Sequence, residues 1–201
     1  MPPAICHGPL ADSQSIVFSG DNRGDQWPGS RIIAAQKATT ANSFSLPGFA
    51  MSTANFYGLV QPGGSAFGFQ ESMPINTAVV YLGPASDWGK GEKDPMANQR
   101  SGGINVFGGG LALYDETGTL LGGLGVSGDT SCTDHIVSWR LRHELGLDYV
   151  PAGMGAGPIK DNMQYGGSGF DAASHPTCDA AATAIVQDLP TTHPIRTVAP
   201  K

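Results

Sequence analysis

The sequence predicts an α+β fold: a single domain, residues 1–201, in which helices flank a mainly antiparallel sheet. Two apolar segments, 110–114 and 119–126, flank a polar turn and have the composition of a β-hairpin. A helix is expected directly after this hairpin, and another over residues 30–41. At 201 residues the chain can bury one proper core, whereas a second independent domain would be cramped.

The composition excludes several classes of partner. Only 14% of the residues are charged and the formal net charge is −6, so we expect neither nucleic acid nor an anionic membrane surface as a partner. No apolar run approaches the roughly 20 residues that span a bilayer, so we expect a soluble protein without membrane insertion. The 29 glycines and 15 prolines predict many turns and long ordered loops.

The sequence predicts a helix after a short β-prone run at 15–19. Ser30 is a suitable N-cap, and small residues along the following ten positions permit close packing against a sheet. Arg31 and Lys37 on this helix have two interpretations. They could present cations to an anionic ligand such as a carboxylate or propionate, or they could be solvated charges on an exposed face.

The middle of the chain is less regular. A short helix is expected within 44–57, and the β-branched and aromatic run 77–82 predicts a strand. Residues 83–103 form a long loop without periodicity, which usually indicates a functional or oligomer-contact element. Within this loop Asp94 and Arg100 are the residues of interest.

A second helix is predicted directly after the hairpin. Ser131 or Thr133 can cap its N-terminus, Asp134 suits the helix dipole in the first turn, and Gly146 is a plausible stop. Its predicted apolar face consists of Ile136, Trp139, Leu141 and Leu145. The strand, the glycine-rich bend and the start of this helix bring backbone N–H groups, carboxylates, a hydroxyl and a histidine around one point, which is where a site is expected.

The C-terminal part, 150–201, is predicted to be a loop-rich extension with one short helix after Cys178 and a tail that is frayed or draped over a neighbour. The chain has three cysteines, so at most one intramolecular disulfide can form. Cys132 and Cys178 could pair, or they could stay reduced as small hydrophobic residues. Pairing would favour an exported or periplasmic protein, and reduced thiols a cytoplasmic one.

His135 and His143 are the titratable groups of most interest, because histidine is a common ligand of haem iron and of metals. They lie eight residues apart on one predicted helix, about 12 Å along its axis, which is too far to bind one metal ion together. Each is therefore a separate candidate for haem iron. Asp134 and His135 could alternatively form the acid/base pair of an enzyme.

Several blocks resemble the HbpS-like/GlcG family of haem-binding and haem-degrading proteins. These are the glycine-rich run 122–128 with Asp134 six positions further on, the helix 31–41 with its lysine before small residues, and the glycines 108–110. The similarity covers roughly residues 16–150. It implies a three-layer fold, a homo-oligomer and haem as the cofactor, with Gly128, Asp129, Thr130 and Asp134 as pocket residues. The same motif could instead be purely conformational, with glycines for the bend and Asp134 for the helix N-terminus.

Three functions follow from these observations. The leading one is a haem- or tetrapyrrole-binding protein, with weak haem degradation in the presence of iron and reductant as a further expectation from the resemblance. The second is an oligomeric accessory module of organic-acid metabolism that holds a small carboxylate through Arg31, Lys37 and the helix N-terminus. The third is an enzyme that uses Asp134 and His135.

Overall fold

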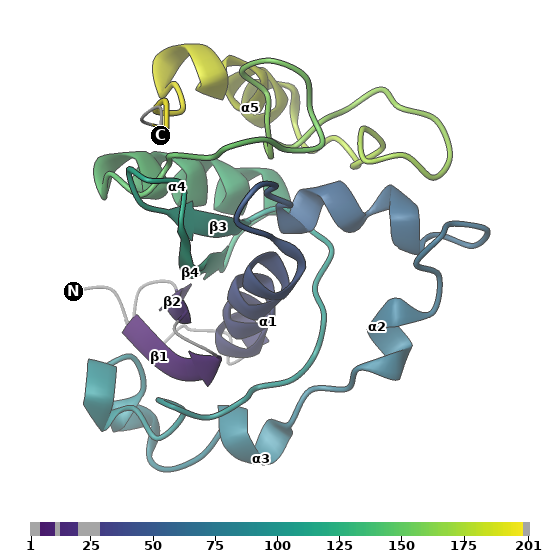
Figure 1. Ribbon diagram of the computed structural model, residues 1–201. Coiled ribbons are helices and arrows are strands. Elements are labelled where there is room, and N and C mark those ends of the chain that lie inside the picture. The colour runs from purple at the N-terminus through teal and green to yellow at the C-terminus, as the bar shows by residue number, and fades with distance from the viewer. Residues whose placement is uncertain (1–4, 11–12, 20–28, 199–201) are drawn as a thin grey trace.

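Four strands form one mixed sheet in the computed structural model, which describes residues 5–10, 13–19 and 29–198. The strands β1 (Ile5–Leu10), β2 (Ser13–Ser19), β3 (Gly110–Tyr114) and β4 (Leu120–Ser127) lie in the order β1-β2-β4-β3 (Figure 1). The pairs β1/β2 and β3/β4 are antiparallel, and β2 runs parallel to β4. The predicted α+β fold, its mainly antiparallel sheet and the β-hairpin are confirmed.

Helices cover both faces of this sheet. The helix α1 (Gly29–Phe44) lies so close to β4 that a Cβ atom at Gly125 would collide with the backbone oxygen of Ala34. Leu111 of β3 belongs to the other face, where it packs with Ile136 and Trp139 of α4 (Ser131–Glu144). The small residues of α1 and the glycines of β4 therefore set the separation of helix and sheet.

Two segments differ from the prediction in the middle of the chain. The run 77–82, predicted as a strand, instead contains the one-turn helix α3 (Thr77–Val80), because the Asn76 carbonyl accepts hydrogen bonds from the amides of Val79 and Val80. The short helix expected within 44–57 is a single 3₁₀ turn, η1 (Thr53–Phe56). The other short helices are η2 (Gly58–Val60), α2 (Phe69–Ser72), η3 (Ala85–Asp87) and η4 (Gly91–Lys93).

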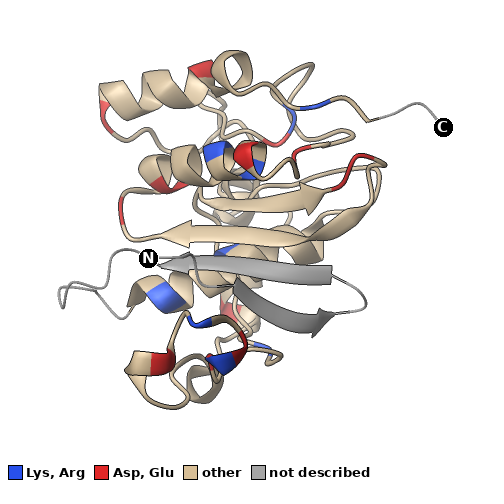
Figure 2. Ribbon diagram, turned by 90° about the vertical axis from the view of Figure 1, so that its left-hand side faces the viewer, with Lys and Arg blue, Asp and Glu red and all other residues tan. Residues whose placement is uncertain are grey.

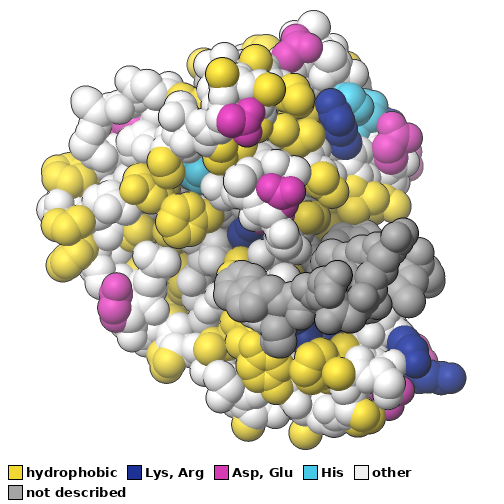
Figure 3. Space-filling model, turned by 180° about the vertical axis from the view of Figure 1, so that it is seen from behind, with side chains coloured by type: hydrophobic (Ala, Val, Ile, Leu, Met, Phe, Trp, Pro, Cys, Tyr) yellow, Lys and Arg dark blue, Asp and Glu magenta, His cyan; other side chains and the backbone are white. Residues whose placement is uncertain are grey.

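Charged side chains are spread thinly over the molecule. Figure 2 shows Lys, Arg, Asp and Glu residues scattered over helices, loops and tail, and on the face seen in Figure 3 the Lys and Arg side chains are few and lie apart. Over the described ranges, no helix combines the length and the apolar character that crossing a bilayer requires.

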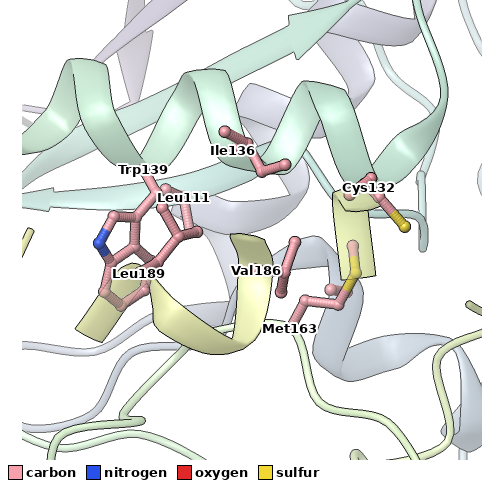
Figure 4. Packing of buried hydrophobic residues seen from close by; sticks show 9 residues of the cluster. Leu111, Cys132, Ile136, Trp139, Met163, Val186 and Leu189 are labelled. Carbon is pink, nitrogen blue, oxygen red and sulfur yellow. The ribbon is translucent and has the colours of Figure 1, made fainter. Parts of the chain in front are cut away.

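The largest apolar cluster lies between α4 and a further helix, α5 (Ala180–Thr192), which packs on the outer side of α4 (Figures 1 and 4). Trp139 of α4 and Leu189 of α5 are almost completely buried in it, and Leu111 joins it from the sheet. The C-terminal part is thus tied to the sheet through α4.

The start and the faces of α4 also differ from the prediction. Its N-cap is Thr130, whose hydroxyl accepts a hydrogen bond from the Thr133 amide at 3.3 Å, and neither Ser131 nor Thr133 is the cap. Leu145, predicted on the apolar face, is 46% exposed, whereas the polar residue Arg142 is fully buried. Because α4 is enclosed by the sheet, α5 and the segment 161–163, packing buries polar side chains that no amphipathic pattern would mark.

A disulfide joins Cys132 in the first turn of α4 to Cys178, which lies 46 residues further on and just before α5. Closing a loop of this length restricts the unfolded chain, so we expect the Cys132→Ala/Cys178→Ala variant to lose about 4 kcal/mol of unfolding free energy. Urea denaturation with and without reductant measures this loss. Reductant should lower the wild-type midpoint and leave that of the double variant unchanged. An equal response in both proteins would contradict the prediction.

Candidate functional site

A buried ion pair joins α1 to α4 at the end of β4. Lys37 Nζ donates to Asp134 Oδ2 at 2.7 Å and to the backbone oxygen of Val126 at 3.1 Å. The other carboxylate oxygen of Asp134 accepts the amide of Asp129 at 3.2 Å, in the glycine-rich bend between β4 and α4. Lys37 is 2% exposed and Asp134 is 3% exposed. The pair therefore connects both helical layers and the bend at a single point.

Gly109, which directly precedes β3, packs against the ion pair of Lys37 and Asp134. Its φ is +114°, and a Cβ atom there would lie 2.6 Å from the Val126 oxygen, 2.9 Å from the Asp134 Cβ and 3.0 Å from Lys37 Nζ. Only glycine fits such a position. Burial lowers the pKa of Lys37 and raises the pKa of Asp134, while the attraction between the two charges opposes both shifts.

Arg31, the other cation of α1, is engaged elsewhere. Its guanidinium makes a two-pronged contact with the Asp94 carboxylate at 2.7 and 2.5 Å, and its Nε donates to the Val80 oxygen at 2.7 Å. Burial by itself raises the pKa of Asp94, but hydrogen bonds from Arg31, Gly89 and Met96 hold it below the ordinary value. The two cations predicted to bind a ligand thus lie in separate ion pairs, and Arg31 fastens the long loop 83–103 onto α1 while Arg100 of that loop stays exposed.

His135 is completely buried behind Asp134 and does not face it. Its Nε2 lies 3.0 Å from Asn162 Oδ1 and 3.2 Å from the Met163 amide nitrogen, and its Nδ1 is buried without a hydrogen-bond partner among the described residues. Burial lowers the pKa of His135 to about 3. Asp134 and His135 therefore have different partners, and the imidazole has no opening towards a ligand.

A second neutral histidine lies in the same interior. His175 accepts a hydrogen bond from the Gly108 amide at 3.2 Å through Nε2, its Nδ1 lies 2.8 Å from the Pro176 oxygen, and burial lowers its pKa to about 4. The rings of Tyr57, Phe107 and Tyr165 surround it. The only sequence signal for this contact is the position of His175 three residues before Cys178, which the disulfide ties to α4.

Arg142 and Asp161 form a buried pair that sequence reasoning missed entirely. Two hydrogen bonds of 2.6 and 2.9 Å join the guanidinium to the carboxylate, and both side chains are fully buried. Arg142 also donates to the Ala112 oxygen of β3 at 3.1 Å. The pair holds the segment that carries Asn162 against α4 and the sheet, and thereby positions the partner of His135.

His143 lies at the opposite end of α4 and is about a quarter exposed. Its Nδ1 lies 2.8 Å from Asp148 Oδ2, and its ring packs edge-on against His193. Arg196 donates to the His143 backbone oxygen at 2.7 Å and pairs with the Asp148 carboxylate. At Arg196 the C-terminal tail is therefore bound to its own chain, and this part of the tail is not frayed as predicted.

With this geometry established, comparison with known proteins identifies the family. The family model described as haem degrading protein HbpS-like matches residues 10–140, well over half of the chain. The chain belongs to the HbpS-like family. This confirms the resemblance read from the glycine-rich run and Asp134. Searches of curated proteins and of solved structures found no match.

The HbpS-like match divides the candidate residues into two groups. Lys37, Asp134 and the bend 128–130 lie inside the matched region, whereas His143, Asp148 and Arg196 lie beyond it. Among the residues that the structure describes, no cluster of three or more His, Cys, Asp or Glu side chains could hold a metal ion. In this HbpS-like chain the closed ion pair at one end of α4 and the partly exposed histidine at the other are distinct places with distinct chemistry.

Proposed function

We propose that this HbpS-like protein binds haem or a related tetrapyrrole and that His143 supplies the ligand to the iron. Family membership supports the class of ligand. The observation that carries the choice of residue is the 2.8 Å contact between His143 Nδ1 and Asp148. A carboxylate on one ring nitrogen fixes the tautomer and the orientation of an imidazole and leaves the other nitrogen, Nε2, as the donor to a metal.

The two histidines on α4 differ sharply in their fit to this role. His135 has no exposed surface, and its Nε2 already contacts Asn162 and Met163. His143 is partly exposed, and its contact to Asp148 uses only Nδ1. Haem held by a neutral imidazole would supply iron for redox chemistry. The residues of this chain would orient that imidazole through Asp148, which is itself held by Arg196.

Titration with hemin, followed by absorbance, tests this proposal. The wild type should show a saturable shift of the Soret band, which His143→Ala should abolish or move to another wavelength. Asp148→Asn should weaken binding by about 10- to 100-fold, because it removes the carboxylate that orients the ring. Glu144→Gln, an exposed change on the same helical turn, is the matched control and should bind as the wild type does. Unchanged binding by His143→Ala, or no saturable shift in the wild type, would refute the proposal.

A further inference from the structure

A cavity of about 670 Å³ lies between the β3–β4 turn, the loop 150–160 and the C-terminal tail. In Figure 2 the tail leaves the molecule on the side where this turn lies. The volume falls in the range typical of sites for small organic molecules, roughly 300–1,000 Å³. Apolar side chains, several of them prolines, form much of the lining: Pro47, Val150, Pro151, Pro158, Ile195 and Val198.

The charged side chains that line this cavity are both cationic. Lys160 and Arg196 both line the cavity, and no acidic residue does so. Arg196 is compensated by Asp148. Lys160 Nζ donates to the Pro151 oxygen at 2.7 Å, and within the described ranges it forms no ion pair with a carboxylate. The ammonium group of Lys160 can therefore form an ion pair with an anionic ligand in this cavity.

The backbone holds Lys160 in place before any ligand arrives. Its φ is +50°, an uncommon conformation for a residue with a side chain, and its carbonyl accepts the Gly155 amide at 2.6 Å. The loop is joined to the rest of the chain by the bond from the Ala50 amide to the Ala152 oxygen at 2.8 Å. Prolines in the lining restrict the backbone further. A preformed site loses less entropy when it binds a ligand than a mobile one does.

We propose that this cavity binds a carboxylate with an apolar body, and that Lys160 pairs with the carboxylate. The apolar walls would cover the body of the ligand, and the Thr117, Thr119 and Thr197 positions that line the cavity offer further polar contacts at its rim. Binding of a carboxylate in this cavity does not require haem to be bound at His143. The carboxylate could belong to a free organic acid or to the propionate of a tetrapyrrole, and the experiment separates these two sources.

The test uses phenylacetate as the probe and phenylacetamide as its neutral counterpart. Amide NMR signals of Gly118, Lys160 and Thr197 are followed during titration of the full chain. Phenylacetate should shift them saturably, and phenylacetamide should bind at least about tenfold more weakly, because a charge-assisted hydrogen bond is lost. Lys160→Met should weaken phenylacetate binding by a similar factor, and Lys160→Arg should retain it. Lys90→Met, an exposed change in the 83–103 loop, is the control and should bind normally.

A second variant keeps the test decisive if Lys160→Met does not fold. Thr197→Trp adds bulk at an exposed position of the lining and should block the cavity. Hemin is then added to the phenylacetate complex to distinguish the two sources of the carboxylate. If hemin displaces phenylacetate from the cavity, the carboxylate is assigned to the propionate of a tetrapyrrole. If phenylacetate stays bound, the carboxylate is assigned to a free organic acid. The proposal is overturned if phenylacetate causes no saturable shift at these amides, if the amide binds equally well, or if Lys160→Met and Thr197→Trp both bind normally.

Discussion

Replacing Lys37 by methionine is expected to lower the free energy of unfolding by about 3–5 kcal/mol, the usual cost of removing one partner from a buried ion pair. Methionine keeps most of the volume of the lysine side chain but leaves the Asp134 carboxylate buried without its 2.7 Å partner. The same change also removes the hydrogen bond to the Val126 oxygen at the end of β4. Urea denaturation followed by circular dichroism measures the effect.

A double variant shows that the cost comes from the unpaired charge. Lys37→Met/Asp134→Leu removes both charges and should recover much of the stability lost by Lys37→Met, because a buried pair can be replaced by apolar residues at little cost. Lys90→Met, which removes an exposed lysine 3.9 Å from Asp87, should change stability by less than about 1 kcal/mol. A Lys37→Met protein as stable as the Lys90→Met protein would show that the pair contributes nothing to the fold.

Acidification from pH 6.5 to pH 5 is expected to destabilise the protein by about 3 kcal/mol, because each of two histidines contributes a slope that rises towards about 1.4 kcal/mol per pH unit as the unfolded chain becomes protonated. Burial lowers the pKa of His135 to about 3 and that of His175 to about 4, from an unfolded value of 6.5. Below pH 6.5 the unfolded chain therefore binds protons that the folded chain does not, and unfolding becomes more favourable as the pH falls. Above about pH 7.5 the histidines are neutral in both states, and this contribution to stability is fully present.

Denaturation curves at a series of pH values measure this dependence. His135→Gln should reduce the slope of stability against pH by about half, since one of the two protons is no longer taken up on unfolding. His175→Gln should reduce the slope by a similar amount, because burial lowers the pKa of that histidine as well. The pKa of Asp94 is lowered from its ordinary value of 3.8, so the stability that this carboxylate contributes is lost only at a pH below about that value. This loss lies outside the range between pH 5 and 6.5. Equal stability at pH 7 and pH 5 would contradict the prediction.

The local elements of this fold were readable from the sequence. The hairpin that contains β3 and β4, the helix α4 directly after it and the small-residue helix α1 all follow from signals between residues a few positions apart. The family was also recognisable, because its glycine-rich run is contiguous in the chain and reflects the close approach of α1 to the sheet. Such features need no knowledge of distant contacts.

Local propensity failed where a neighbouring backbone group decided the outcome. In the described structure, the β-branched run 77–82 has no adjacent strand with which it could pair. The Asn76 carbonyl instead accepts hydrogen bonds from the amides of Val79 and Val80, which form the turn of α3. Thr130 became the cap of α4 in place of Ser131 or Thr133 because its hydroxyl reaches the Thr133 amide. Strand propensity and capping preference depend strongly on such surroundings.

The roles of the candidate site residues were decided only by the tertiary structure. Lys37 and Asp134 are 97 positions apart, Arg31 and Asp94 are 63 apart, and only the packing of helices and loops on the sheet makes each a pair. The same packing buries His135 and leaves His143 partly exposed, although both lie on α4. The sequence by itself determined the local elements and the family, because these depend on neighbouring residues. Which charges are paired, which histidine is accessible and where a cavity lies depend on desolvation and long-range contacts, which exist only once the chain has folded.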